Sequence, residues 1–112
     1  MLKVMWFLKR AEGITLEEFD AWWREHLQMI ADRQRPQLLR YTVNIRTSDT
    51  DELAGHTGAE CEWDGVAEQW VADEAAFVEV YGRPAASHTR SDTLAHVSRF
   101  ERLFVHEINV IE

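Results

Sequence analysis

The sequence predicts an α+β fold, in which a four-stranded antiparallel sheet carries two helices on one face. Three observations predict it: apolar runs near both ends of the chain, an alternating segment in the middle, and apolar residues at helical spacing between them. A chain of 112 residues is long enough for a single core. We therefore expect one domain that spans residues 1–112.

The first two elements have the clearest patterns. Leu2–Lys9 is an apolar run with bulky residues at both parities, which is typical of a strand buried on both faces. Thr15 and Glu18 have the spacing of a capping box, and they predict the start of a helix over residues 16–33. The chain therefore begins with a strand followed by a helix.

The later elements follow from alternation, turn residues and helical spacing. In order, we expect strands at 38–46 and 61–71 with a bend at Asp64–Gly65, a helix at 72–81, a short helix or turn at 85–97, and a last strand at 103–111. The order strand, helix, strand, strand, helix, strand is that of the ferredoxin-like fold.

Two helices can cover only one face of such a sheet. The first and last strands nevertheless carry apolar residues on both sides, among them Met5, Phe7, Leu103 and Ile111. An apolar face of this kind is most simply covered by a second copy of the chain. On burial grounds we predict a homodimer.

Composition limits the partners and the setting. Twelve basic against twenty acidic residues give a net charge of −8, which argues against nucleic-acid binding and against anionic membrane surfaces. The single cysteine, Cys61, allows no intrachain disulfide, and the apolar run at residues 2–8 is too short for a signal peptide or a membrane span. We expect a cytoplasmic protein that binds a small molecule.

His26 is an ionisable residue on the apolar side of the first predicted helix. Each helical residue advances by about 100°, so His26 lies about 20° from Phe19, near the middle of the apolar arc. It is either a neutral core residue bonded to a backbone carbonyl or to Tyr41, or a general base in an apolar pocket. The spacing alone does not decide between these roles.

Two segments, FLKRAEGITLEEFDAWWREH at 7–26 and WDGVAEQWVADEAAF at 63–77, resemble the EthD family of dimeric α+β barrel proteins. EHLQM at 25–29 and LLRYTV at 38–43 are also similar to the methylmuconolactone isomerases, which are cofactor-free relatives. The resemblance implies that His26 faces a pocket between helices and sheet, where the corresponding histidine of the relatives is an active-site group. The isomerases carry a cysteine where this sequence has Gln69, whose amide can hold a carbonyl but cannot act as acid or base.

The candidate site combines this resemblance with strand parity. The candidate catalytic residues are His26, Tyr41 and His96, and the candidate substrate-binding residues are Trp23, Met29, His56 and Gln69. Tyr41 shares the apolar side of its strand and can equally be a core residue. For His96 the position in the sequence favours a solvated surface residue, and His56 lies in a loop that could cover the pocket. Glu68 has the opposite parity to Gln69, and we expect it to face the dimer partner.

The function predicted from these residues is a cofactor-free lyase (dehydratase) or isomerase/cyclase that acts on a small apolar carbonyl compound. No His-Glu-x-x-His pattern and no glycine-rich phosphate loop is present, so we expect neither a metal nor another cofactor. The alternatives are a cofactor-independent or haem-linked monooxygenase and a non-catalytic protein that binds a metabolite.

Overall fold

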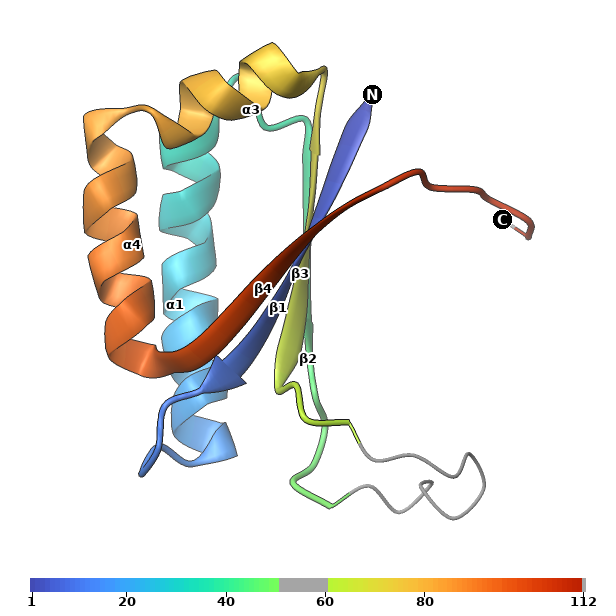
Figure 1. Cartoon of the computed structure of the whole chain (residues 1–112). Helices are drawn as coiled ribbons and strands as arrows, with labels where there is room; N and C mark the ends of the chain where they lie inside the picture. Colours follow the sequence, from blue (N-terminus) through green and yellow to red (C-terminus); the bar gives the residue numbers. More distant parts are fainter. Residues whose placement is uncertain (51–60, 112) are drawn as a thin grey trace.

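The computed structural model describes residues 1–50 and 61–111 (Figure 1). The elements are β1 (Leu2–Arg10), α1 (Leu16–Gln34), β2 (Arg40–Ile45), β3 (Gly65–Val71), α3 (Glu74–Tyr81), α4 (Pro84–His96) and β4 (Val97–Val105). The strands form one antiparallel sheet in the order β2-β3-β1-β4. This order confirms the predicted ferredoxin-like fold.

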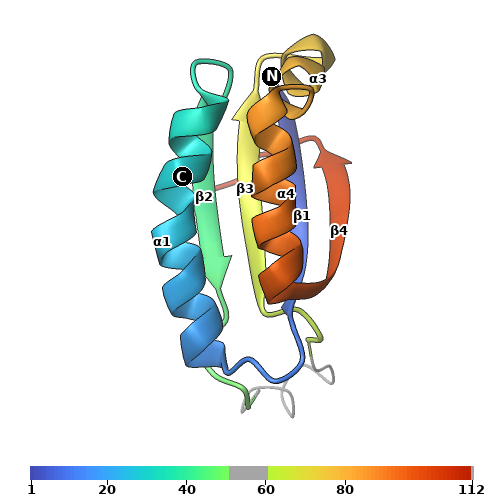
Figure 2. The same cartoon turned by 90° about the vertical axis from the view of Figure 1, so that its left-hand side faces the viewer.

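The helices lie on one side of the sheet, and the C-terminal residues extend on the other side (Figure 1). Seen from the helix side, α1 and α4 stand side by side in front of the strands, with β4 at the far edge (Figure 2). Strand register determines which side chains face the helices. Trp6 of β1 pairs with Ala67 of β3, and Ala67 pairs with Val43 of β2, so these three share the helix side.

Each helix begins at a residue suited to that position. The Thr15 hydroxyl accepts a hydrogen bond from the Glu18 backbone N–H at 3.1 Å, so the predicted cap of α1 is present. The Asp73 carboxylate does the same for α3, accepting from the Ala76 N–H at 2.9 Å. α4 begins with Pro84, whose missing N–H costs nothing at the first helical position.

The last strand differs from its prediction. It was expected at 103–111 but runs over Val97–Val105, and residues 106–111 lie outside the sheet. The reason is the register with β1: Lys3 pairs with Val105, and β1 begins at Leu2, so its partner strand cannot continue much further. His106, which falls within the predicted strand, lies outside β4 and is exposed.

Other boundaries also shift. The strand expected at 38–46 is Arg40–Ile45, and the strand expected at 61–71 begins only at Gly65. The segment predicted as a short helix or turn at 85–97 is the helix α4. Gly65 begins β3 beside a buried aromatic ring. A Cβ on Gly65 would lie 2.1 Å from the ring carbon Cζ3 of Trp23, so only glycine allows this close approach.

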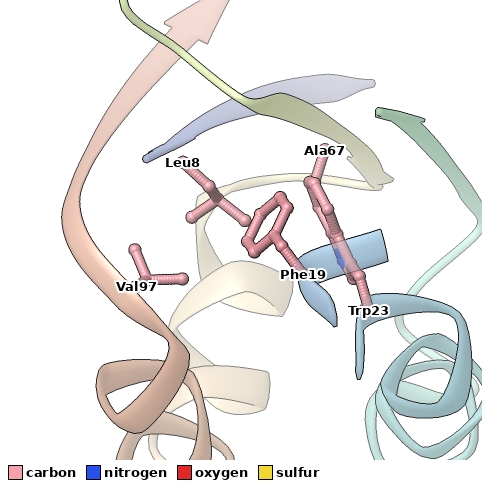
Figure 3. Close-up of a cluster of buried hydrophobic side chains, with 5 residues drawn as sticks. All are labelled: Leu8, Phe19, Trp23, Ala67 and Val97. Carbon is pink, nitrogen blue, oxygen red and sulfur yellow. The ribbon is translucent and has the colours of Figure 1, made fainter. Parts of the chain in front are cut away.

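The core lies between α1 and the sheet. Phe19 is completely buried and Trp23 is 2% exposed, and both point from α1 toward Leu8 and Ala67 of the strands (Figure 3). The two aromatic rings lie 5.4 Å apart. This cluster holds α1 against the sheet, and some of its side chains also border a cavity.

The outer face of the sheet, on the side away from the helices, combines apolar and charged side chains. Lys3 lies 2.8 Å from Glu68 and 2.9 Å from Glu107, and its ammonium group and the Arg40 guanidinium both stack on the ring of Trp70. Glu68 therefore faces away from the helices, as its parity predicts. None of the described helices has both the length and the apolar character needed to cross a bilayer.

Candidate active site

A cavity of about 570 Å³ lies between α1, α4 and the helix side of the sheet. Its lining is mostly aromatic and aliphatic, with polar groups from each wall: Trp6, Leu8, Trp22, Trp23, His26, Ile30, Gln34, Tyr41, Ala67, Gln69, Tyr81, Ala86, Thr89, Arg90, Thr93, Leu94, Phe100 and Arg102. A concave, largely apolar space with a few convergent polar groups is typical of a small-molecule site.

His26 contributes the titratable group of this cavity. It is 6% exposed, and its Nδ1 lies 2.7 Å from Oδ2 of Asp92 on α4. This is an ion-pair distance, but the geometry is not that of a hydrogen bond. The same carboxylate oxygen accepts a hydrogen bond from the indole N–H of Trp22 at 3.2 Å. Because Nδ1 is turned toward Asp92, Nε2 is the nitrogen left for a ligand in the cavity.

Trp22 is stacked between two imidazole rings. Its ring centroid lies 4.9 Å from that of His26 and 4.5 Å from that of His96, with interplanar angles of 26° and 9°. His96 is held in turn by its Nδ1, which lies 2.9 Å from the backbone oxygen of Asp92. His96 is not among the residues that line the cavity, and its contact with Trp22 lets it help to position His26.

The surroundings favour the neutral form of His26. Burial lowers the pKa of His26, and the Asp92 carboxylate opposes this shift only in part, while Arg33 and His96 lower the pKa further. At neutral pH the imidazole is therefore unprotonated at one nitrogen, as a general base must be.

Tyr41 lies on the opposite wall of the cavity. Burial raises the pKa of the Tyr41 phenol to about 12, and the neighbouring Trp23 indole offsets only part of this shift. The phenol therefore stays protonated at neutral pH and can donate a hydrogen bond to an oxygen atom of a ligand.

Gln69 is the centre of a buried hydrogen-bond network at the base of the cavity. Its Oε1 accepts hydrogen bonds from Tyr81 at 2.6 Å and from the Trp6 indole at 3.0 Å, and its Nε2 donates to Gln34 Oε1 at 2.8 Å. Because an indole N–H can only donate, the amide orientation of Gln69 is determined. One hydrogen of Nε2 remains for a ligand.

The structure thus brings His26, Tyr41, Trp23 and Gln69 together around one cavity. It does not bring Met29 into the lining: Met29 is half-buried and lies about 60° around α1 from His26. His56 falls outside the described residues.

Several residues in and around the cavity were not predicted from the sequence. Asp92 is the most important, and it was missed because α4 has almost no apolar periodicity that would show which of its faces is turned inward. Tyr81, Gln34 and Trp6 were missed as polar partners because their contacts join distant parts of the chain. Within residues 1–50 and 61–111, no three histidine, cysteine, aspartate or glutamate side chains come together as a metal site.

The family model of the EthD domain matches residues 11–100. The chain belongs to the EthD family. No curated protein matches it in sequence.

Three solved structures resemble this EthD domain in fold. The Arabidopsis thaliana protein At3g17210 is 11% identical with a TM-score of 0.70, and the match covers 100% of both chains. A dimeric ferredoxin-like protein from Thermobifida fusca is 9% identical with a TM-score of 0.69, covering 93% of this chain and 88% of the other. SnoaB, a cofactor-independent oxygenase from Streptomyces nogalater, is 13% identical with a TM-score of 0.64.

 

The alignment with SnoaB covers 98% of this chain and 97% of the SnoaB chain. At these identities the likeness shows a shared fold alone.

The lowered pKa of His26 predicts a pH-dependent stability. As the pH falls below about 6.5, the unfolded chain takes up a proton on His26 before the folded chain does, so the free energy of unfolding decreases. Above that pH both states hold a neutral imidazole and the effect disappears. Urea unfolding between about pH 7 and pH 5.5 should therefore show a loss of stability that is reduced in His26→Gln.

His88, which is exposed on α4, provides the matched control. His88→Gln should keep the pH dependence of the wild type. If His26→Gln instead shows the same pH dependence as the wild type, His26 does not have a lowered pKa.

Proposed function

We propose that this EthD domain is a small cofactor-free enzyme, either a lyase (dehydratase) or an isomerase/cyclase. It would remove a proton next to the carbonyl of a small apolar compound, such as an aromatic polyketide or a lactone. The observation that carries the proposal is the buried His26, unprotonated at neutral pH and backed by Asp92, in an aromatic cavity of about 570 Å³.

His26 is the proposed general base. Its Nε2 accepts the proton from the carbon beside the carbonyl, and the electron pair of that C–H bond forms the enolate. The Asp92 carboxylate, 2.7 Å from Nδ1, stabilises the imidazolium that results. Trp22 and His96 keep the ring in place through the stack behind it.

The enolate oxygen needs hydrogen-bond donors in the same cavity. Tyr41 supplies a protonated phenol, and Gln69 supplies the free hydrogen of Nε2, whose orientation the buried network determines. The imidazolium then returns its proton to a different carbon in an isomerisation, or to a departing hydroxyl group in a dehydration. Both outcomes balance without an added oxidant or reductant.

Replacing the base tests this proposal. The probe is 2-tetralone, an aromatic ketone of suitable size, whose α-protons exchange for deuterium in D₂O at a rate that NMR can follow. General-base catalysis is typically worth about 10²–10⁴ in rate, so His26→Gln should slow the enzyme-catalysed exchange by about that factor. Asp92→Asn should also slow it, because the imidazolium then loses its counter-charge.

The control separates chemistry from packing. His88→Gln should leave the exchange rate unchanged, and His26→Gln should unfold at nearly the wild-type temperature because glutamine keeps much of the volume and a hydrogen-bond donor. If His26→Gln exchanges the probe as fast as the wild type, His26 is not the base. A non-catalytic metabolite-binding protein then becomes the better account.

A second function, cofactor-independent oxygenation, is supported by the likeness to SnoaB, which is described as a cofactor-independent oxygenase. The same first step would serve it, because a carbanion formed by His26 can react with molecular oxygen. Oxygen consumption during turnover separates the two functions: a lyase or isomerase consumes none.

We also propose that the protein is a homodimer in which the outer faces of two sheets meet. Met5 and Phe7 are half-buried on this face, and Leu103 is 51% exposed. The Thermobifida fusca protein of the same fold, which is described as dimeric, supports this arrangement. Covering the outer face would remove these apolar side chains from water.

A charge on the outer face should weaken the dimer. Leu103→Asp would bury a carboxylate at the interface, so sedimentation equilibrium at micromolar concentration should show dissociation. Val78→Asp is the matched control, since Val78 is 67% exposed but lies on α3, on the helix side. A monomeric wild type, or an unchanged dimer in Leu103→Asp, would contradict the proposed interface.

A further inference from the structure

The charged residues of the cavity all have the same sign. Arg90 of α4 and Arg102 of β4 line it, and no aspartate or glutamate is among the described lining residues. The chain as a whole carries a net charge of −8. The cavity is therefore a cationic site in an acidic protein, and apolar walls strengthen the field inside it.

Arg102 is held in place by aromatic rings and not by a carboxylate. It pairs with Trp6 across β1 and β4, so both side chains face the helix side. Its guanidinium carbon lies 4.9 Å from the ring centroid of Phe104, 5.4 Å from that of Phe77 and 5.8 Å from that of Trp6. Cation–π contacts of this kind do not use up the N–H donors of a guanidinium, which can still bind another partner.

Within the described residues, Arg102 has no carboxylate partner. Arg99, three residues earlier on β4, shows the contrast: it lies on the outer face and contacts Glu62 at 3.3 Å and Glu101 at 2.8 Å. Arg90 likewise forms no ion pair with a described carboxylate, and it reaches the cavity from the opposite wall. Both arginines that line the cavity thus have N–H donors that no described carboxylate occupies.

We propose that the cavity binds an aromatic compound with a negative charge, a carboxylate or a phenolate, and that Arg102 holds this anion with the help of Arg90. Arginine binds carboxylates through paired N–H donors, and the aromatic walls accept the ring of the ligand. The inference rests on the proposed function in one respect: it assumes that the aromatic ring of the bound anion lies beside His26, the proposed base. It makes Arg102 the residue that selects the substrate class.

Two probes of the same shape test the inference by calorimetry. These are 1-naphthoate, which is an anion, and 1-naphthamide, which is neutral. The wild type should bind 1-naphthoate about 10- to 100-fold more tightly, since a hydrogen bond to a charged group is worth about that factor. Added salt should weaken the binding of 1-naphthoate and leave that of 1-naphthamide unchanged.

The variants assign the preference to one residue. Arg102→Gln should remove most of the preference for the anion while binding 1-naphthamide as before, and Arg102→Lys should retain part of it because the charge remains. Arg90→Gln should cause a smaller loss. Arg99→Gln, the matched control on the outer face of β4, should bind both probes like the wild type.

Three results would overturn the inference: equal affinities of the wild type for the two probes, binding of neither probe, or an unchanged preference in Arg102→Gln. The measurement in the wild type needs no variant, so it stands even if Arg102→Gln does not fold. Failure of the proposed function would appear elsewhere, as an unchanged rate of 2-tetralone exchange in His26→Gln. The two proposals can therefore fail separately.

Discussion

The contact between His26 and Asp92 is the interaction on which the rest of the site depends. It joins α1 to α4 at 2.7 Å and turns Nδ1 of the imidazole away from the cavity. Without Asp92, an imidazolium formed at this buried position would lack the carboxylate that lies beside Nδ1. The same carboxylate accepts a hydrogen bond from Trp22, whose ring stacks on His26 and on His96, so Asp92 contacts or lies beside each part of this aromatic group.

A second buried network gives the cavity its other polar end. Gln69 is 4% exposed, and its hydrogen bonds join β3 to α1, to β1 and to Tyr81 at the end of α3. A buried amide without hydrogen-bond partners is costly, and Trp6, Gln34 and Tyr81 each form one hydrogen bond with the Gln69 amide. The cavity thus has a basic nitrogen on one side and oriented donors on the other, with aromatic walls between them.

The fold could be predicted from the sequence because local patterns determine it: the capping box at Thr15, the alternation around Tyr41 and the placement of His26 on the apolar arc all hold in the structure. The site could be predicted only in part. Asp92 lies on a helix without apolar periodicity, so nothing local marked its inward side. β4 ends at Val105 because that residue pairs with Lys3 near the start of β1. The sequence of residues 108–111 gives no information on this register, so the strand was predicted too far toward the C-terminus.

The protonation of His26 tests the central claim most directly. Nitrogen NMR of the imidazole as a function of pH reports which ring nitrogen carries the proton and where the ring titrates. We predict that Nδ1 is protonated and Nε2 is free at neutral pH, with a pKa below the ordinary value of 6.5. A proton on Nε2, or a pKa above 6.5, would contradict the account, because the nitrogen that faces the cavity could not then act as a base.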